Sequence, residues 1–455
     1  MAALTASRIQ TRATLSDRAR GLVEDVSWTP WVLAAAFPAL FVHIRYQPKV
    51  SLALGSTSVD VSLADLAIAA VVAAALLRAR RDGFAPLRAS RWLLVAAGAF
   101  VAIALLSLAT PSLLGEEYAL ARHAVSALKF AWYALLLPAV VLLVRARPDA
   151  SPLFRVAVAW SAVASAWGLL QFLGWVDEFE GRRPGQREPS FVGIHDLAAL
   201  SAAALVLGLA ALALARDQPL SRRWCATALA AGGVGIVLSG AMTGVAGVWL
   251  ALVAIVLLAR LRGQLRRRGA VIAAIVALAV TAGTTLQRSD NLVELAEFIG
   301  LVDRTEQTTG AESYPQRALL AYIGARIWLE HPIVGVGWQA SDEEWAYGPQ
   351  LDDARARFPD QPDAAFPSPE NPWGVQTLYV QALADFGIVG FASLCALVGI
   401  AVVMAVRRAR TSSVPVVGLA WLLACAGVWA GLGIVAGIPV LALTWIAFGL
   451  VTVRG

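Results

Sequence analysis

Residues 194–215 read IHDLAALSAAALVLGLAALALA, and this stretch decides the class of fold. It contains one acidic residue, Asp196, and neither Lys nor Arg. About 20 mostly apolar residues are enough for a helix to cross a bilayer. A helix that is apolar around its whole circumference does not suit the surface of a soluble domain. The stretch therefore predicts a membrane-spanning helix.

Similar stretches recur along the whole chain of 455 residues, which is 58% hydrophobic and 15% charged. Soluble domains carry about 25% charged residues. The sequence thus predicts an all-α polytopic membrane protein of about 12 transmembrane helices. We place these spans near residues 28–45, 58–78, 92–109, 126–144, 152–175, 194–215, 224–240, 243–260, 270–286, 385–406, 413–433 and 435–452.

Short runs of arginine between the spans indicate the orientation. Most of the 37 Lys and Arg residues fall in segments on one side of this map, and such segments face the cytoplasm. We therefore expect a bacterial inner-membrane protein with both termini cytoplasmic: a cytoplasmic segment at 1–27, spans 1–9 within 28–286 and spans 10–12 within 376–455. The same distribution argues against a nucleic-acid partner, despite a net charge of +6.

The segment 287–375, between spans 9 and 10, faces outward on this map. It contains fifteen Asp or Glu and six Arg, and loops of such length in a compact protein are usually functional. Residues 316–330, QRALLAYIGARIWLE, have helical periodicity, and Pro332 ends that helix. Gly335 and Gly337 then allow a close approach of two backbones. We expect a large helical loop domain on the periplasmic side.

Two outward segments contain arginines that suit a phosphate. Arg182, Arg183 and Arg187 precede the start of the sixth span, and Arg317 begins the helix of the outer loop. Guanidinium forks bind phosphate oxygens in pairs, and a helix N-terminus favours an anion. The alternatives are arginines that reach lipid headgroups for the first group and an ordinary surface arginine for Arg317.

Candidate acid–base and polar residues lie at the same end of the spans. Glu370 and Gln376 stand where the outer loop re-enters the membrane. A carboxylate there can accept the proton of a sugar hydroxyl, or alternatively interact with a helix dipole. His195 is a candidate substrate-binding residue, although it does not face its neighbour Asp196 on a helix. No set of His, Cys and acidic residues has metal-ligand spacing, so we expect neither a metal nor a cofactor.

In these segments the sequence resembles the O-antigen ligase and Wzy-type polymerase superfamily, membrane glycosyltransferases of the GT-C type. The similar stretches are REPSFVGIHDLAAL from Arg187, the helix from Arg317 with HPIVGVG, and QTLYVQALADFG from Gln376. Asp65 in the second span and the long loop 287–375 also fit. The order and spacing of these features match over nearly the whole chain.

The resemblance implies an inverting, metal-independent enzyme that transfers or polymerises undecaprenyl-diphosphate-linked oligosaccharide at the outer face of the inner membrane. The acceptor would be a glycan or a lipid. By match, Arg187 and Arg317 hold the diphosphate. We expect Arg183, His195 and Gln376 to contact the substrate as well, although His195-Asp196 stands where the family usually has Asn.

One departure from the family matters for the chemistry. The His that begins the last family motif is Gln376 here, and glutamine cannot accept a proton as a base. Glu370 is our substitute for that base.

Three other functions compete with this interpretation. A flippase or transporter for lipid-linked oligosaccharide usually shows internal repeats and helices broken near the midplane, and neither is evident in the sequence. A peptidoglycan polymerase of the shape-and-division family is disfavoured because its loop acids are not recognisable. A non-catalytic scaffold is disfavoured by the outward arginines. The choice between ligase and polymerase stays open.

Overall fold

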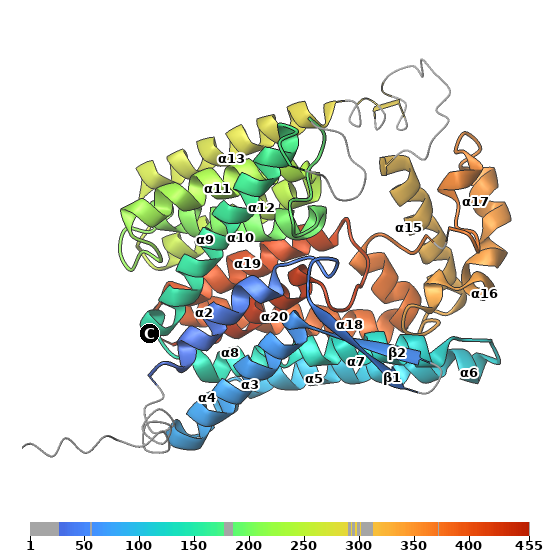
Figure 1. The fold of residues 1–455 in the computed structure, drawn as a ribbon, viewed down its shortest axis with the longest axis horizontal. Coiled ribbons are helices and arrows are strands. Elements are labelled where there is room, and N and C mark those ends of the chain that lie inside the picture. The colour runs from blue at the N-terminus through green and yellow to red at the C-terminus, as the bar shows by residue number, and fades with distance from the viewer. Residues whose placement is uncertain are drawn as a thin grey trace, which may run out of the picture.

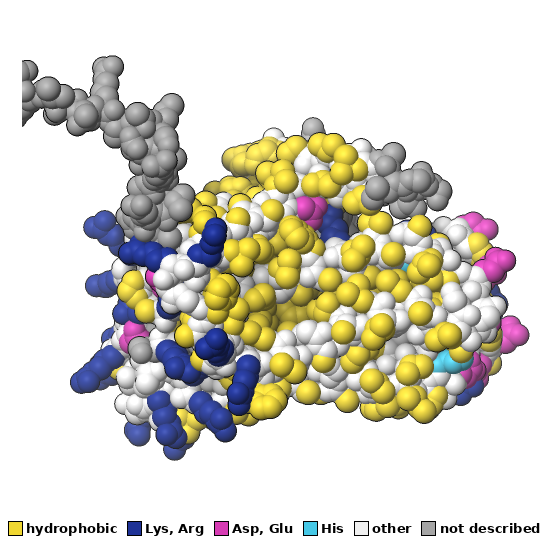
Figure 2. Space-filling view, turned by 90° about the horizontal axis from the view of Figure 1, so that it is seen from below, with side chains coloured by type: hydrophobic (Ala, Val, Ile, Leu, Met, Phe, Trp, Pro, Cys, Tyr) yellow, Lys and Arg dark blue, Asp and Glu magenta, His cyan; other side chains and the backbone are white. Residues whose placement is uncertain are grey.

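A computed structural model describes residues 27–54, 57–176, 185–289, 313–371 and 373–454, together with 293, 296–297 and 301. Most helices lie roughly along one common axis (Figure 1). Helices α15–α17 lie at one end of the bundle, and the C-terminus lies near the other end. Figure 2 shows Lys and Arg gathered at the end opposite α15–α17, a hydrophobic belt in the middle and acidic side chains at the far end. We call the two ends the arginine-rich end and the loop end.

The described helices of the bundle are α2 (Thr29–Leu40), α3 (Leu63–Asp82), α4 (Ala85–Ala89), α5 (Arg91–Leu106), α6 (Thr110–Leu114), α7 (Leu120–Ala134), α8 (Leu136–Leu143), α9 (Arg147–Phe172), α10 (Ile194–Ala213), α11 (Arg222–Ser239), α12 (Met242–Leu261), α13 (Arg267–Gln287), α18 (Leu378–Arg408), α19 (Val414–Trp429) and α20 (Pro439–Leu450). Those of the long loop are α15 (Ser313–Glu330), α16 (Glu344–Tyr347) and α17 (Leu351–Arg357), with short 3-10 turns between them.

The helices support a multi-pass membrane protein. Among the described residues, seven helices are long and apolar enough to cross a bilayer, and α2, α19 and α20 are shorter apolar helices. A helix lies in each stretch that the sequence predicted to span, so the mainly helical class is confirmed. The predicted spans 413–433 and 435–452 are shorter as helices, because residues 430–438 form a loop between α19 and α20.

Helix α10, formed by the stretch quoted first, is the centre of the bundle. In its most apolar stretch of 18 residues, 94% of the residues are buried inside the protein. The helix packs against α9, α11, α12, α13, α19 and α20. Small residues permit this: a Cβ on Gly232 of α11 would lie 2.6 Å from the backbone N of Leu205. Lipid tails are as apolar as the helix surfaces, so membrane helices associate mainly through the close van der Waals packing that small residues allow.

One hairpin departs from the all-α prediction. Strands β1 (Lys49–Leu54) and β2 (Thr57–Ser62) pair antiparallel, with Lys49 opposite Ser62. The sequence placed the start of the second span at 58. Ser62 and Asp65 instead form a capping box that starts α3 at Leu63, and such a reciprocal cap satisfies the backbone N–H groups at a helix start.

The predicted helix of the outer loop is confirmed as α15. Its apolar positions Leu319, Leu320, Ile323 and Ile327 are buried. These residues form the core of a small cluster with residues of α16 and α17. The described part of the outer loop from α15 to α17 is therefore a packed unit with its own small apolar core.

The segment after α15 is inserted into a break in α18. At Gly387, with φ of 61°, the helix geometry is interrupted. There Val336 N donates to Ala384 O at 2.9 Å and Ile388 N donates to Pro332 O at 2.8 Å. A Cβ on Gly335 would lie 2.4 Å from the backbone of Asp385. The close approach predicted for Gly335 is confirmed, and it fixes the outer loop to a spanning helix.

Candidate functional site

Loop 430–438, between α19 and α20, accepts hydrogen bonds from several segments at the loop end. Its Leu432 O accepts a hydrogen bond from Leu378 N at 2.9 Å. Gln339 of the outer loop donates to Ile434 O at 3.1 Å, and Tyr133 of α7 donates to Gly437 O at 3.1 Å. The loop thus lies between elements that are far apart in the sequence, and two groups of functional side chains border it.

The first group begins with Arg187 and Arg288. Both side chains pack over Gly240, which forms the tight turn between α11 and α12: a Cβ there would lie 2.8 Å from Arg187 Cγ and 3.2 Å from Arg288 Cδ. Gly240 has φ of 57°, in the left-handed region. Arg187 Nε donates to Ser239 O at 2.9 Å. One small left-handed turn therefore brings two arginines together.

Arg317 joins this group from the second turn of α15. The Arg288 guanidinium lies over the ring of Tyr314, 5.6 Å from its centre, and Tyr314 stands one helical turn before Arg317. Arg317 Nη1 would be 3.5 Å from a Cβ on Gly431 of loop 430–438. Arg317 Nε donates to Gln376 Oε1 at 3.2 Å. We call Arg187, Arg288 and Arg317 the arginine site.

Positive charge is concentrated in the arginine site. Only 6% of Arg288 is exposed. Neither Arg288 nor Arg317 forms an ion pair with a carboxylate in the described part of the chain. Burial lowers the pKa of Arg317, and the like charge of Arg288 lowers it further, whereas Tyr314 opposes this shift. Guanidinium stays charged in proteins, so a bound anion would relieve the repulsion.

The second group lines a cavity of about 490 Å³ at the same end. Its centre is a contact between His123 Nε2 and Glu343 Oε1 at 2.7 Å, and Arg122 Nη2 lies 3.0 Å from the same oxygen. His123 is buried and stacks on Tyr118, with ring centres 4.4 Å apart. We call this cavity the polar pocket. The contacts with His123 and Arg122 hold the Glu343 carboxylate in place within the polar pocket.

Buried carboxylates support the polar pocket. Asp385 of α18 accepts hydrogen bonds from Gln339 N at 3.0 Å and Ser341 N at 3.2 Å, which fixes the backbone beneath the cavity. Burial raises the pKa of Asp342 to about 7, and the neighbouring charge of Glu343 acts in the same direction. Asp342 therefore changes its protonation near neutral pH.

The structure brings some of the residues proposed from sequence together and separates others. Arg187 and Arg317 belong to the arginine site, and Gln376 accepts a hydrogen bond from Arg317 beside it. Glu370 is exposed beside Pro369, which lines the polar pocket. His195 is half-buried at the start of α10. Its neighbour Asp196 accepts a hydrogen bond from Val440 N at 2.9 Å, at the junction of α10 and α20. Arg182 and Arg183 lie outside the described residues, as do residues 1–26.

Asp65, which the resemblance singled out, caps α3 and pairs with Lys129 of α7. Asp65 Oδ2 lies 3.2 Å from Lys129 Nζ. The Lys129 side chain in turn packs on Gly437 of loop 430–438. This pair is a structural support of the same loop.

Sequence reasoning missed Arg288 and the His123–Glu343 pair. Arg288 had a readable signal: it directly follows the ninth predicted span at its outward end, where the positive-inside rule makes arginine uncommon. His123 and Glu343 had none, because 220 positions separate them.

A comparison with known families identifies a related domain within the chain. Residues 225–395 match a family model, Wzy_C, described as O-Antigen ligase. The match runs from α11 into α18 and includes Arg288, Arg317 and Gln376. It confirms the resemblance to the O-antigen ligase and Wzy-type superfamily over this part of the chain. No curated protein matches the chain. The family and the helices together support a membrane enzyme that processes glycans.

Proposed function

We propose that this chain is a glycosyltransferase that transfers or polymerises undecaprenyl-diphosphate-linked oligosaccharide at the outer face of the bacterial inner membrane. The observation that carries this proposal is the convergence of Arg187, Arg288 and Arg317 at the loop end. In this orientation the arginine-rich end of Figure 2 faces the cytoplasm, as the positive-inside rule favours.

The arginine site supplies the charge that the reaction needs. When the bond between the anomeric carbon and the diphosphate breaks, negative charge develops on the leaving oxygen. Guanidiniums that are already in place stabilise this charge without reorganisation. We therefore propose a metal-independent transfer. Gln376 does not act as a base here. Its side-chain oxygen instead accepts a hydrogen bond from Arg317 and so positions that guanidinium.

The polar pocket suits the acceptor. An acceptor hydroxyl attacks the anomeric carbon on the face opposite the diphosphate, so the new bond forms as the old one breaks and the configuration inverts. The hydroxyl proton passes to a carboxylate. Glu370 at the rim and Glu343, held by His123 within the pocket, are the two candidates.

The first test is a reconstituted assay with undecaprenyl-diphosphate-linked oligosaccharide, with and without a separate acceptor, followed by glycan size on a gel. Longer glycans on the carrier alone identify a polymerase. Transfer only after an acceptor is added identifies a ligase. If no product forms while labelled lipid crosses the bilayer, the protein is a flippase and the proposal fails.

Variants then test the residues. Arg187→Ala should lower turnover by about a hundredfold to a thousandfold and leave the melting temperature of the purified protein nearly unchanged, whereas full activity in this variant would refute the diphosphate assignment. Glu343→Gln and Glu370→Gln separate the two candidate bases: the base is the residue whose loss lowers kcat and removes the acidic limb of the pH–rate profile. If neither variant does so, the base lies outside the polar pocket.

A further inference from the structure

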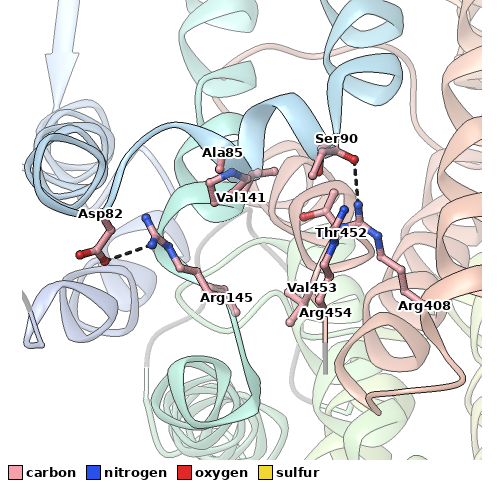
Figure 3. A pocket seen from close by; sticks show the side chains of 12 residues that line it. Asp82, Ala85, Ser90, Val141, Arg145, Arg408, Thr452, Val453 and Arg454 are labelled. Carbon is pink, nitrogen blue, oxygen red and sulfur yellow. Dashed lines mark hydrogen bonds and ion pairs between the residues drawn. The ribbon is translucent and has the colours of Figure 1, made fainter.

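A second basic cavity lies at the arginine-rich end, far from the arginine site. Its volume is about 250 Å³. Figure 3 shows the side chains of Arg145, Arg408 and Arg454 approaching it from three separate segments. They come from the linker between α8 and α9, the end of α18 and the residues after α20. We call this cavity the basal pocket.

The basal pocket has more positive than negative charge. Arg145 Nη1 pairs with Asp82 at 3.1 Å, while its Nη2 is buried without a hydrogen-bond partner. Arg408 donates to Ala89 O at 3.0 Å. Within the described ranges, neither Arg408 nor Arg454 is ion-paired with a carboxylate. Three guanidiniums therefore face one carboxylate.

An apolar groove continues from this pocket. A cavity of about 600 Å³ shares Ala89, Ser90 and Arg408 with the basal pocket and extends between α5 and α18. Apart from Ser90, Arg407 and Arg408, it is lined by apolar side chains and by Gly399, where an added Cβ would meet nothing within 4 Å. Trp92 at its edge is 64% exposed. Exposed tryptophan marks the headgroup level of a bilayer, so the pocket lies at the depth of lipid phosphates.

We propose that the basal pocket and this groove together bind one anionic phospholipid from the leaflet on the arginine-rich side. Its phosphate lies among Arg145, Arg408 and Arg454, which offer guanidinium forks to the oxygens. One acyl chain lies in the groove between α5 and α18. Basic pockets between membrane helices recognise anionic headgroups in this manner. A free phosphate shares the headgroup chemistry and leaves the groove empty.

The test uses the full chain in nanodiscs of phosphatidylcholine that contain phosphatidylglycerol, followed by native mass spectrometry of the lipid that stays bound after transfer to detergent. The double variant Arg408→Gln/Arg454→Gln should retain about tenfold less phosphatidylglycerol than the unmodified protein. The matched control is Arg80→Gln/Arg410→Gln, which removes two exposed arginines of the same end and should retain the lipid.

A second variant tests the groove without removing charge. Gly399→Leu fills it and, because leucine favours helix more than glycine, should not destabilise α18. It should lower phosphatidylglycerol retention severalfold. Gly98→Leu is its control, because Gly98 of α5 is exposed, an added Cβ there meets nothing within 4 Å, and the groove does not include it.

The outcomes decide between the sources of phosphate. Selective loss in both test variants, with both controls unchanged, supports a phospholipid. Equal retention of phosphatidylglycerol and phosphatidylcholine by the unmodified protein overturns the proposal. The proposal is also overturned if inorganic phosphate releases bound phosphatidylglycerol equally from Gly399→Leu and from the unmodified protein. That result would identify a site for a free anion.

Discussion

Arginine has different surroundings in two regions of this molecule. At the arginine-rich end, Arg78 pairs with Asp149 at 3.1 Å and Arg147 pairs with Asp217 at 3.1 Å. At the loop end, Arg288 is buried, Arg317 is half-buried, and neither has a carboxylate partner in the described residues. Among the described residues, Arg78 and Arg147 thus have their charge balanced within the protein, unlike Arg408 and Arg454 of the same end. We propose that the charge of Arg288 and Arg317 serves a ligand.

The difference separates a structural role from a functional one. An ion pair that is partly buried contributes to folding only while both partners remain. Buried cations without partners cost stability, and proteins retain such strain mainly where it serves a function. The comparison predicts that substitutions of ion-paired arginines such as Arg78 and of arginine-site residues such as Arg317 change different quantities.

The largest effect is expected for Arg317→Ala. Removal of one preorganised donor to a developing charge lowers kcat by about a hundredfold to a thousandfold. The melting temperature should hold or rise, because repulsion from Arg288 disappears. Turnover in the reconstituted assay and thermal unfolding in detergent are the two measurements. A large fall in melting temperature with turnover per folded molecule retained would place Arg317 among the structural arginines.

Arg78→Ala should have the opposite signature. Arg78 also donates to Leu143 O at 2.6 Å, and its loss leaves the Asp149 carboxylate half-buried without this partner. We expect about 3 kcal/mol of destabilisation, measured by denaturant unfolding, and unchanged kcat per folded molecule. Loss of kcat in fully folded Arg78→Ala would erase the distinction between the two ends.

Asp342→Asn tests the polar pocket through pH. The pKa of Asp342 is raised to about 7 in the folded protein, chiefly by burial, from 3.8. The folded state thus holds a proton that the unfolded state releases, so stability falls as pH rises from about 4 to about 7 and levels off above. Asp342→Asn should remove this fall and be more stable than the unmodified protein at pH 8. Parallel melting-temperature profiles for both proteins would contradict the shift.

Arg326→Ala should have the smallest effect and serves as the control for Arg317. Arg326 lies on the same helix, and its Nε is 3.2 Å from Asp353 Oδ2 at a partly exposed position. Such pairs contribute about 0–1 kcal/mol. Melting temperature and turnover should both remain close to those of the unmodified protein. A strong loss of turnover would show that any arginine of α15 matters, irrespective of its charge partners.

Much of the fold could be predicted because it depends on local features. The apolar length of residues 194–215 predicted α10, and periodicity with Pro332 predicted α15 and its end. The glycines of HPIVGVG predicted a close backbone approach, although not the partner, which is the break in α18 at Gly387. The β1–β2 hairpin was missed, because its short alternating strands merged with the following apolar stretch.

The sequence by itself determined the membrane-spanning stretches, the side on which arginines gather, and Arg187, Arg317 and Gln376 as candidates. The stretches and the side follow from hydropathy and charge, which a linear chain displays directly, and the three candidate residues rest on the resemblance to the family as well. Only the tertiary structure decided that Arg288 completes the arginine site and that His123 faces Glu343. It also placed both groups on loop 430–438. Contacts between segments a hundred or more residues apart depend on how helices pack, and packing leaves no local pattern in a sequence.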